Sequence, residues 1–269
     1  MKFKHTALIY FSPTDTTRIV LEEIAKGIGN DISCVLDITR PENRLQPPPE
    51  FKDTLVLIGA PVYGGRLQKD AALYFKSIRS SGSMAVLVVL YGNREVEDAL
   101  LELKDIAVED GFFPLAAGTF IGEHSFATAQ YPIALNRPDE KDRNKAVLFG
   151  KQIAELLIRN ENPLNLPPVD VPGDFPYKER LALGPLHFID VGDACDGCGI
   201  CLSVCPENAI DETDTYATIE KKCIYCCACI KACPLDARIM IDSPIMEKAE
   251  WLNENCTRRK DPRTFLSGE

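Results

Sequence analysis

The chain has 269 residues, 45% of them hydrophobic, and a formal net charge of −10 at pH 7. This length fits two domains better than one, and the negative charge argues against nucleic acid or an anionic membrane as a partner. No apolar stretch has the length of a membrane helix, and the apolar run at residues 6–11 is too short for a signal peptide.

The first segment predicts a strand, a loop and a helix that together form an anion site. Residues 5–11 are β-branched and aromatic, which indicates a buried strand, and residues 18–28 carry an apolar stripe with helical spacing. The loop between them is rich in hydroxyl side chains, namely Ser12, Thr14, Thr16 and Thr17. Because the first turn of a helix has free backbone N–H groups and a positive dipole end, this loop predicts an anion-binding site. A plain N-cap is the alternative, although a cap needs only one hydroxyl.

This loop resembles the phosphate-binding loop of flavodoxins, Ser/Thr-x-Thr-Gly-x-Thr, because Ser12, Thr14 and Thr17 match its hydroxyl positions. Asp15 stands where that family has glycine. Aspartate tolerates a positive φ better than most residues, and its carboxylate must point to solvent to leave room for a phosphate. The effect of Asp15 on the affinity for phosphate stays open. The resemblance implies that a flavin phosphate contacts Ser12, Thr14, Asp15, Thr16 and Thr17.

Strands and helices then alternate along the chain. Strands are predicted at residues 33–38, 54–59, 84–90 and 112–120, and helices at residues 68–79, 95–109 and 139–158. Strands that are apolar throughout indicate a sheet covered on both faces. The alternation therefore predicts an α/β domain with a doubly wound, five-stranded parallel sheet, whose ligand binds outside the carboxyl ends of the strands.

The loops at those carboxyl ends are suited to a flat ring, because glycine allows close approach and tyrosine can stack. They hold Pro61, Val62, Tyr63, Gly64 and Gly65 after the third strand, Tyr91, Gly92, Asn93 and Arg94 after the fourth, and residues 122–125 after the fifth. The resemblance to flavodoxins covers residues 5–158 and implies a bound FMN whose isoalloxazine lies between the first two loops. No Gly-x-Gly-x-x-Gly follows a strand, so neither FAD nor NAD(P) is implied. His124 is interpreted as an ordinary loop residue, with a proton donor to the flavin as the alternative.

The rest of the chain divides by composition. Prolines spread through residues 160–186 predict an extended, semi-rigid linker between two domains. We therefore expect a flavodoxin-like, FMN-binding domain at residues 1–159, the linker at 160–186, and a small α+β domain like bacterial ferredoxin at 187–242. Residues 243–269 are expected to form a helix, at 244–255, and a polar tail.

The most specific pattern of the chain is Cys-x-x-Cys-x-x-Cys-x-x-x-Cys-Pro, which occurs twice. The first copy is Cys195, Cys198, Cys201, Cys205 and Pro206, and the second is Cys223, Cys226, Cys229, Cys233 and Pro234. This is the spacing of bacterial ferredoxins with two [4Fe-4S] clusters, in which the fourth cysteine of each run ligates the other cluster. It implies one cluster on Cys195, Cys198, Cys201 and Cys233 and a second on Cys223, Cys226, Cys229 and Cys205.

Two other uses of cysteine fit this pattern less well. A zinc ribbon closes one tetrahedral site and leaves the third and fourth cysteines of each copy unused, and disulfide frameworks belong to small secreted domains. Three of the 11 cysteines lie outside the pattern, of which Cys34 and Cys227 are interpreted as packing residues. Because eight thiolates committed to iron imply a reducing compartment, we expect a cytoplasmic protein.

The whole chain resembles the flavodoxin–ferredoxin fusion proteins labelled EFR1-family ferredoxins, which are found in anaerobes. The resemblance implies an electron-transfer protein that passes electrons between two [4Fe-4S] clusters and a bound FMN, and on to redox partner proteins. The alternative is a flavin-dependent oxidoreductase that the clusters supply with electrons, although no catalytic residue is predicted. Residues 185–242 hold 10 acidic against 4 basic side chains, which favours partners with a basic docking patch. The oligomeric state and the reduction potentials stay open.

Overall fold

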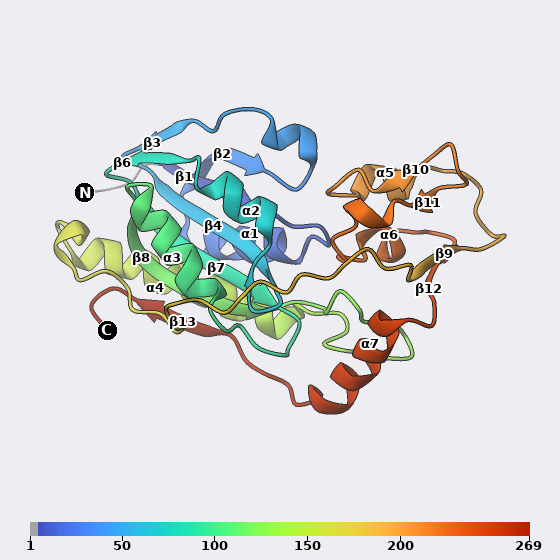
Figure 1. Ribbon diagram of the computed structural model, residues 1–269. Helices are drawn as coiled ribbons and strands as arrows, with labels where there is room; N and C mark the ends of the chain where they lie inside the picture. Colours follow the sequence, from blue (N-terminus) through green and yellow to red (C-terminus); the bar gives the residue numbers. More distant parts are fainter. Residues whose placement is uncertain (1–4) are drawn as a thin grey trace.

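Five parallel strands form the centre of the amino-terminal domain (Figure 1). The computed structural model describes residues 5–269, so residues 1–4 of the predicted first domain lie outside the described residues. The strands pair in the order β2-β1-β4-β7-β8, which is the 2-1-3-4-5 order of the flavodoxin-like fold. Their bounds are His5–Tyr10 (β1), Asp31–Asp37 (β2), Leu55–Tyr63 (β4), Met84–Tyr91 (β7) and Phe113–Ile121 (β8). The predicted fold class is therefore confirmed.

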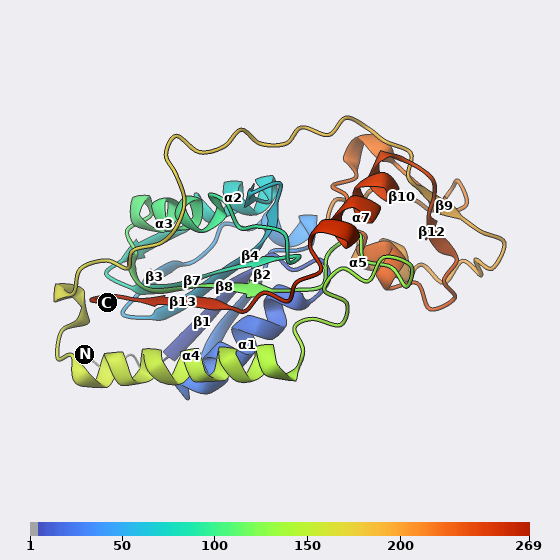
Figure 2. The ribbon, with the colours of Figure 1, turned by 90° about the horizontal axis from the view of Figure 1, so that it is seen from below.

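Four helices cover the two faces of this sheet, α1 and α4 on one side and α2 and α3 on the other (Figure 2). Their bounds are Thr16–Ile28 (α1), Lys69–Phe75 (α2), Ala99–Glu109 (α3) and Glu140–Arg159 (α4). Each side has its own hydrophobic core, one around Leu21 and Phe149 and the other around Phe75 and Leu103. Strand β7 is buried along its whole length because both faces are covered.

Helices α1 and α4 cross at two glycines. A Cβ on Gly150 would lie 2.1 Å from the carbonyl oxygen of Ile24, and a Cβ on Gly27 would lie 2.1 Å from that of Val147. Only glycine permits such an approach of two helix backbones, so these residues fix the position of α1. The hydroxyl-rich loop before α1 is thereby held at the edge of the sheet.

Two helices are shorter than their predicted ranges, 68–79 and 95–109. Glu97 has a φ of 48°, which α-helical backbone does not allow, so α3 begins at Ala99. After α2 the chain turns into a short strand, Arg79–Ser81 (β6), which pairs in parallel with Glu50–Lys52 (β3). Both differences come from backbone contacts that the apolar spacing does not encode.

The carboxyl terminus returns to the first domain, which the sequence analysis did not anticipate. The predicted polar tail contains a strand, Arg263–Leu266 (β13), that pairs antiparallel with β8 and extends the sheet at its edge. Figure 2 shows this segment running beside β8, close to the end of the chain. This strand was not predicted because a four-residue edge strand is specified by a partner far away in sequence. A second short antiparallel strand, Arg66–Leu67 (β5), pairs with β4.

The cysteine-rich region forms a small second domain beyond the carboxyl ends of the parallel strands (Figure 1). It contains two antiparallel strand pairs, β9 with β12 and β10 with β11, and two short helices. The bounds are Ile189–Val191 (β9), Ile200–Val204 (α5), Ile210–Asp211 (β10), Ala217–Thr218 (β11), Ala228–Lys231 (α6) and Arg238–Met240 (β12). The predicted carboxy-terminal helix is Pro244–Asn255 (α7), capped by the Ser243 hydroxyl, which accepts from the Met246 N–H at 3.3 Å. Single 3₁₀ turns lie at Pro41–Arg44 (η1), Pro163–Asn165 (η2) and Glu220–Lys222 (η3).

The segment between the two domains packs along the first domain. The carboxylate of Asp98 accepts hydrogen bonds from the N–H groups of Asp174, at 2.9 Å, and Lys178, at 2.6 Å. The side chains of Val169 and Val171 are buried in the core on the α2–α3 side. The extended segment is therefore anchored by side-chain and main-chain contacts.

Ionic contacts fix the second domain to the loops of the first. Arg44 lies 3.0 Å from a carboxylate oxygen of Glu207 and donates to the carbonyl oxygen of Pro206 at 2.9 Å. On the other side, Lys231 of α6 forms an ion pair with Glu123.

Between residues 5 and 269, no helix combines the length and the apolar character that crossing a membrane requires.

Candidate functional site

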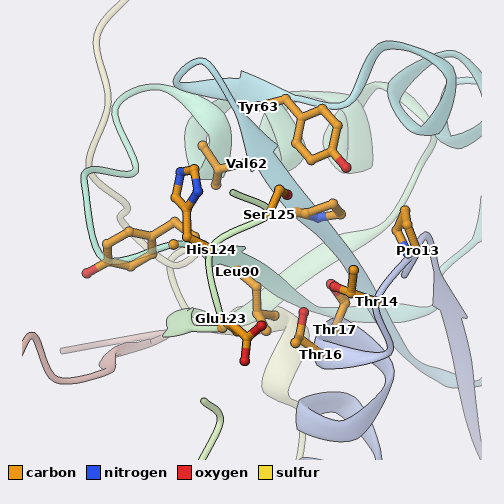
Figure 3. A pocket seen from close by; sticks show the side chains of 14 residues that line it. Pro13, Thr14, Thr16, Thr17, Val62, Tyr63, Leu90, Glu123, His124 and Ser125 are labelled. Carbon is orange, nitrogen blue, oxygen red and sulfur yellow. The ribbon is translucent and has the colours of Figure 1, made fainter. Parts of the chain in front are cut away.

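A pocket lies at the carboxyl edge of the sheet (Figure 3). Its walls come from the loop before α1 and from the ends of β4, β7 and β8. Eight of the predicted flavin contacts line it: Thr14, Thr16, Thr17, Pro61, Val62, Tyr63, Tyr91 and Gly92. Figure 3 shows Tyr63 on one side of the pocket and Thr14, Thr16 and Thr17 on the other.

The threonine side of the pocket suits a phosphate. Thr17 is only 1% exposed, and its buried hydroxyl has no hydrogen-bond partner in the protein. The N–H groups of Thr16 and Thr17 lie in the first turn of α1, where no intrahelical carbonyl accepts them. An anion at this position would satisfy these donors and the positive end of the helix dipole at once.

Asp15 does not obstruct this site. Its φ is 61°, the left-handed conformation that glycine adopts readily, and it is the residue before the first turn of α1. Its carboxylate lies 3.0 Å from Arg18 Nε and its side chain is 64% exposed, so the negative charge faces solvent and a cation. The structure thus places Asp15 as the sequence analysis required for a phosphate to enter.

Six predicted contacts do not line the pocket. Ser12 is buried below it, where its hydroxyl accepts from the Arg18 N–H at 3.1 Å. Asn93 faces the carboxy-terminal segment and donates to the carbonyl oxygen of Cys256 at 2.6 Å. Arg94 forms an ion pair with Glu97 at 2.7 Å. The others are Asp15, Gly64 and Gly65, and a Cβ on Gly65 would collide with the Glu97 side chain.

Six lining residues were outside the predicted set: Pro13, Leu90, Gly122, Glu123, His124 and Ser125. Four of them form the loop after β8, whose place at the same sheet edge was visible in the sequence. His124 is mostly buried, and its Nδ1 accepts from the Phe126 N–H at 3.0 Å. Burial, helped by the charges of Lys231, Arg94 and Lys248, lowers the pKa of His124 to about 4. The imidazole is therefore neutral at pH 7, with its proton on Nε2.

The second domain contains two small cavities, each lined by four of the predicted ligands. The outer cavity is lined by Cys195, Cys198, Cys201 and Cys233. The inner cavity is lined by Cys205, Cys223, Cys226 and Cys229. The fourth cysteine of each sequence run thus lies at the cavity of the other run. None of the 11 cysteines forms a disulfide bond.

The sulfurs of the predicted ligands have similar surroundings in both copies of the repeat. Within residues 5–269, no three thiol, carboxylate or imidazole groups converge as the ligands of one metal ion. Backbone N–H groups point at the sulfurs in the same way in both copies, from Ala209 to Cys205 Sγ at 3.1 Å and from Ala237 to Cys233 Sγ at 3.2 Å. Such N–H···S bonds stabilise the thiolate form that iron requires.

The repeat also explains Cys227. In each copy a short helix carries the third cysteine, and the residue before that helix has a left-handed backbone conformation. This residue is Gly199, with φ 73°, in the first copy and Cys227, with φ 55°, in the second. Cys227 therefore occupies the position that glycine holds in the first copy. It is buried and lines the inner cavity beside the four predicted ligands.

Tyr63 lies close to both the pocket and the inner cavity. Its ring lines the pocket, and burial raises the pKa of its phenol well above the usual value. The neighbouring thiols of Cys226, Cys227 and Cys223 raise that pKa further, and a hydrogen bond with Ser125 opposes them. Ile224, between two of these cysteines, packs against the core of the first domain.

Comparisons with known proteins agree with this division. A family profile described as a 4Fe-4S binding domain matches residues 191–211, which include the first cysteine run. A curated protein of Proteus vulgaris, described as a "probable iron-sulfur subunit" of the Frd operon, is 39% identical over 80 residues, which are 29% of this chain and 51% of that protein. The chain thus spans about half the length of the curated relative it matches.

Among solved structures, the chain is similar to a flavodoxin from the domain Archaea, with 13% identity and a TM-score of 0.36 over 56% of this chain and 96% of that one. It is also similar to oxidised flavodoxin 2 from Bacillus cereus, with 14% identity and a TM-score of 0.39 over 56% of this chain and 98% of that one. The strand order and the matched profile together show a flavodoxin-like α/β domain joined to a 4Fe-4S binding domain.

Proposed function

We propose that this chain is an electron-transfer protein that carries two [4Fe-4S] clusters and one FMN and exchanges electrons with partner proteins. A cluster passes one electron at a time, whereas a flavin accepts one or two. A chain with both converts between the two kinds of transfer. The proposal agrees with the resemblance to flavodoxin–ferredoxin fusion proteins of the EFR1 family.

The observation that carries the proposal is the position of the inner cavity against the first domain. Ile224 lines this cavity and packs against the same core as Val62, which lines the pocket. A flavin in the pocket and a cluster in the inner cavity would therefore be neighbours within one folded unit. Because the ion pairs Arg44–Glu207 and Lys231–Glu123 fix the two domains, no diffusional encounter is needed between them.

The assignment of the cofactors follows from the donors. FMN fits the pocket because the unpartnered Thr17 hydroxyl and the first turn of α1 favour a terminal phosphate. The outer cavity offers four thiols and the inner cavity offers five, of which four are the predicted ligands, and four is the number that one [4Fe-4S] cluster requires. At the outer cavity, Cys195 and Cys198 are exposed, so this is the side on which we place the contact with a redox partner.

A rapid-mixing experiment tests this function. Anaerobic protein is mixed with less than one equivalent of dithionite, and the flavin absorbance is followed after the clusters have been reduced. We expect a first-order rate that does not change with protein concentration, because the transfer is intramolecular. A rate proportional to protein concentration, or a flavin that stays oxidised while the clusters are reduced, would contradict the proposal.

A comparison of acceptors separates the carrier from the enzyme alternative. The reduced protein is mixed with oxidised ferredoxin-type and flavodoxin-type proteins, and separately with small organic acceptors. Exchange with redox proteins alone supports the carrier. Steady turnover of an organic acceptor without a second protein would favour an oxidoreductase, for which the neutral His124 in the pocket wall is the candidate hydrogen-bond donor.

A further inference from the structure

The internal repeat makes corresponding positions of the two cavities comparable, and at one of them the residues differ in charge. The first copy continues after its fourth cysteine as Pro-Glu-Asn-Ala-Ile210, and the second continues as Pro-Leu-Asp-Ala-Arg238. Ile210 is 7% exposed and lines the inner cavity. Arg238 is 2% exposed and lines the outer cavity. An apolar side chain in one copy is thus replaced by a buried cation in the other.

The contacts of Arg238 leave its charge uncompensated by protein carboxylates. Its guanidinium donates to the carbonyl oxygen of Tyr216 and, at 2.6 Å, to the hydroxyl of Thr218. Its Nε is buried without a hydrogen-bond partner. In the described part of the chain, no Asp or Glu side chain forms an ion pair with Arg238. A buried charge is costly unless an opposite charge or further hydrogen bonds compensate it, so the compensating charge must come from elsewhere.

Two contacts place this charge between the two cavities. Arg238 forms part of the wall of the outer cavity, together with Cys195, Cys198, Cys201 and Cys233. Its guanidinium also donates to the hydroxyl of Thr218, a residue that lines the inner cavity. The guanidinium therefore lies between the two ligand sets.

We propose that Arg238 is the shared counter-cation of the two clusters and that it raises their reduction potentials, most at the outer cavity whose wall it forms. This inference rests on the proposed function, because it requires clusters in both cavities. One electron from an external reductant adds one negative charge to a cluster. Arg238 stays protonated and stabilises that charge by attraction, which is strong where water is excluded.

The difference between the two copies of the repeat should make the outer cavity the preferred position of an added electron. Because the outer cavity has Arg238 where the inner cavity has Ile210, a single electron on the clusters would be held preferentially at the outer cavity. The exposed Cys195 and Cys198 lie there. Arg238 would thus keep the electron on the side from which a partner protein can take it.

The test is a redox titration of the full chain, purified without air and followed by electron paramagnetic resonance of the reduced clusters. Arg238→Ile copies the residue of the other repeat, and Arg238→Lys keeps the charge. We expect the Ile variant to lower the equilibrium constant for reduction of at least one cluster by tenfold or more, which is 59 mV for a one-electron couple. The reduction potential of the Lys variant should stay closer to that of the wild type than to that of the Ile variant.

The matched control is Lys221→Ile, which removes one exposed cation from the same domain. Its potentials should change little, because water and salt screen an exposed charge. If the Ile variant cannot hold iron, Arg238→Gln replaces it, since this side chain keeps hydrogen-bond donors without the charge. Unchanged potentials in a neutral variant with full iron content, or equal shifts in the Lys and neutral variants, would overturn the inference. Wild-type protein without two clusters would instead refute the proposed function.

Discussion

Lys231 of α6 forms an ion pair with Glu123 of the pocket wall, and both side chains are about four-fifths buried. The same ammonium lies 3.4 Å from the carbonyl oxygen of Ala127. One residue of the 4Fe-4S binding domain is therefore bound directly to the loop that closes the flavodoxin-like pocket. The pair fixes the distance between the two sites, and it can be tested without removing a cofactor ligand.

A double-mutant cycle on Lys231→Met and Glu123→Gln should show that the pair couples the two domains. Because a hydrogen bond to a charged group contributes about 1.5–3 kcal/mol, we expect a coupling free energy within that range in anaerobic urea unfolding. Lys222→Met is the control, since Lys222 is exposed and forms no ion pair among the described residues. Additive effects of the two substitutions would show that the pair does not hold the domains together.

Thr17→Val should weaken the binding of FMN but not the binding of riboflavin, which lacks the phosphate. The substitution removes the unpartnered hydroxyl at nearly constant volume. We expect a loss of about 10-fold to 100-fold in FMN affinity, in line with one hydrogen bond to an anion. Flavin fluorescence titration of the apoprotein measures both affinities. Equal losses for the two flavins would place the phosphate elsewhere.

The buried His124 should make a destabilising contribution to the free energy of unfolding that grows as the pH falls. Its pKa is about 4 in the folded chain against 6.5 for the free side chain, so between these values the unfolded chain binds a proton that the folded chain does not. The free energy of unfolding therefore falls as the pH is lowered through this window, by about 3 kcal/mol at most. In urea unfolding between pH 7 and pH 5, the wild type should therefore lose stability relative to His124→Gln as the pH falls.

Two acidic groups change the free energy of unfolding with pH in the opposite direction. Their contributions cancel when the wild type is compared with the variant. Burial raises the pKa of Asp110 to about 6 and that of Glu207 to about 7. Both bind protons in the folded chain before the unfolded one, so they stabilise the fold as the pH falls. They are present in both proteins, and the difference between wild type and variant reports His124. A wild type and a variant with parallel pH profiles would show that His124 is not held neutral.

Substitution of Cys227 and of its neighbour Cys226 should have different effects on the iron content. Cys227 holds the left-handed position of Gly199 in the other copy, so Cys227→Gly should fold without strain and keep the full iron content. Cys226→Ser removes a predicted ligand and should lower the iron content by about half. Iron analysis of anaerobic protein compares the two. Iron loss in Cys227→Gly would make Cys227 a ligand.

The sequence predicted the site where local spacing determines it and missed it where distant contacts do. The first three cysteines of each run are separated by two residues and reach one cavity from tight turns, so their arrangement follows from the repeat. The threonines before α1 were likewise found from the strand–loop–helix order. Asn93, however, is held by the carbonyl oxygens of Cys256 and Arg258, at the far end of the chain. That contact, like the pairing of β13 with β8, has no signal in the residues around Asn93.

The most direct measurement is the content of iron, acid-labile sulfide and flavin in protein purified without air. The account predicts about eight irons, about eight sulfides and about one FMN per chain, because two sets of four thiols and one phosphate-binding pocket are present. Four irons per chain, a single metal ion, or a preparation that holds no flavin even after incubation with FMN would contradict it.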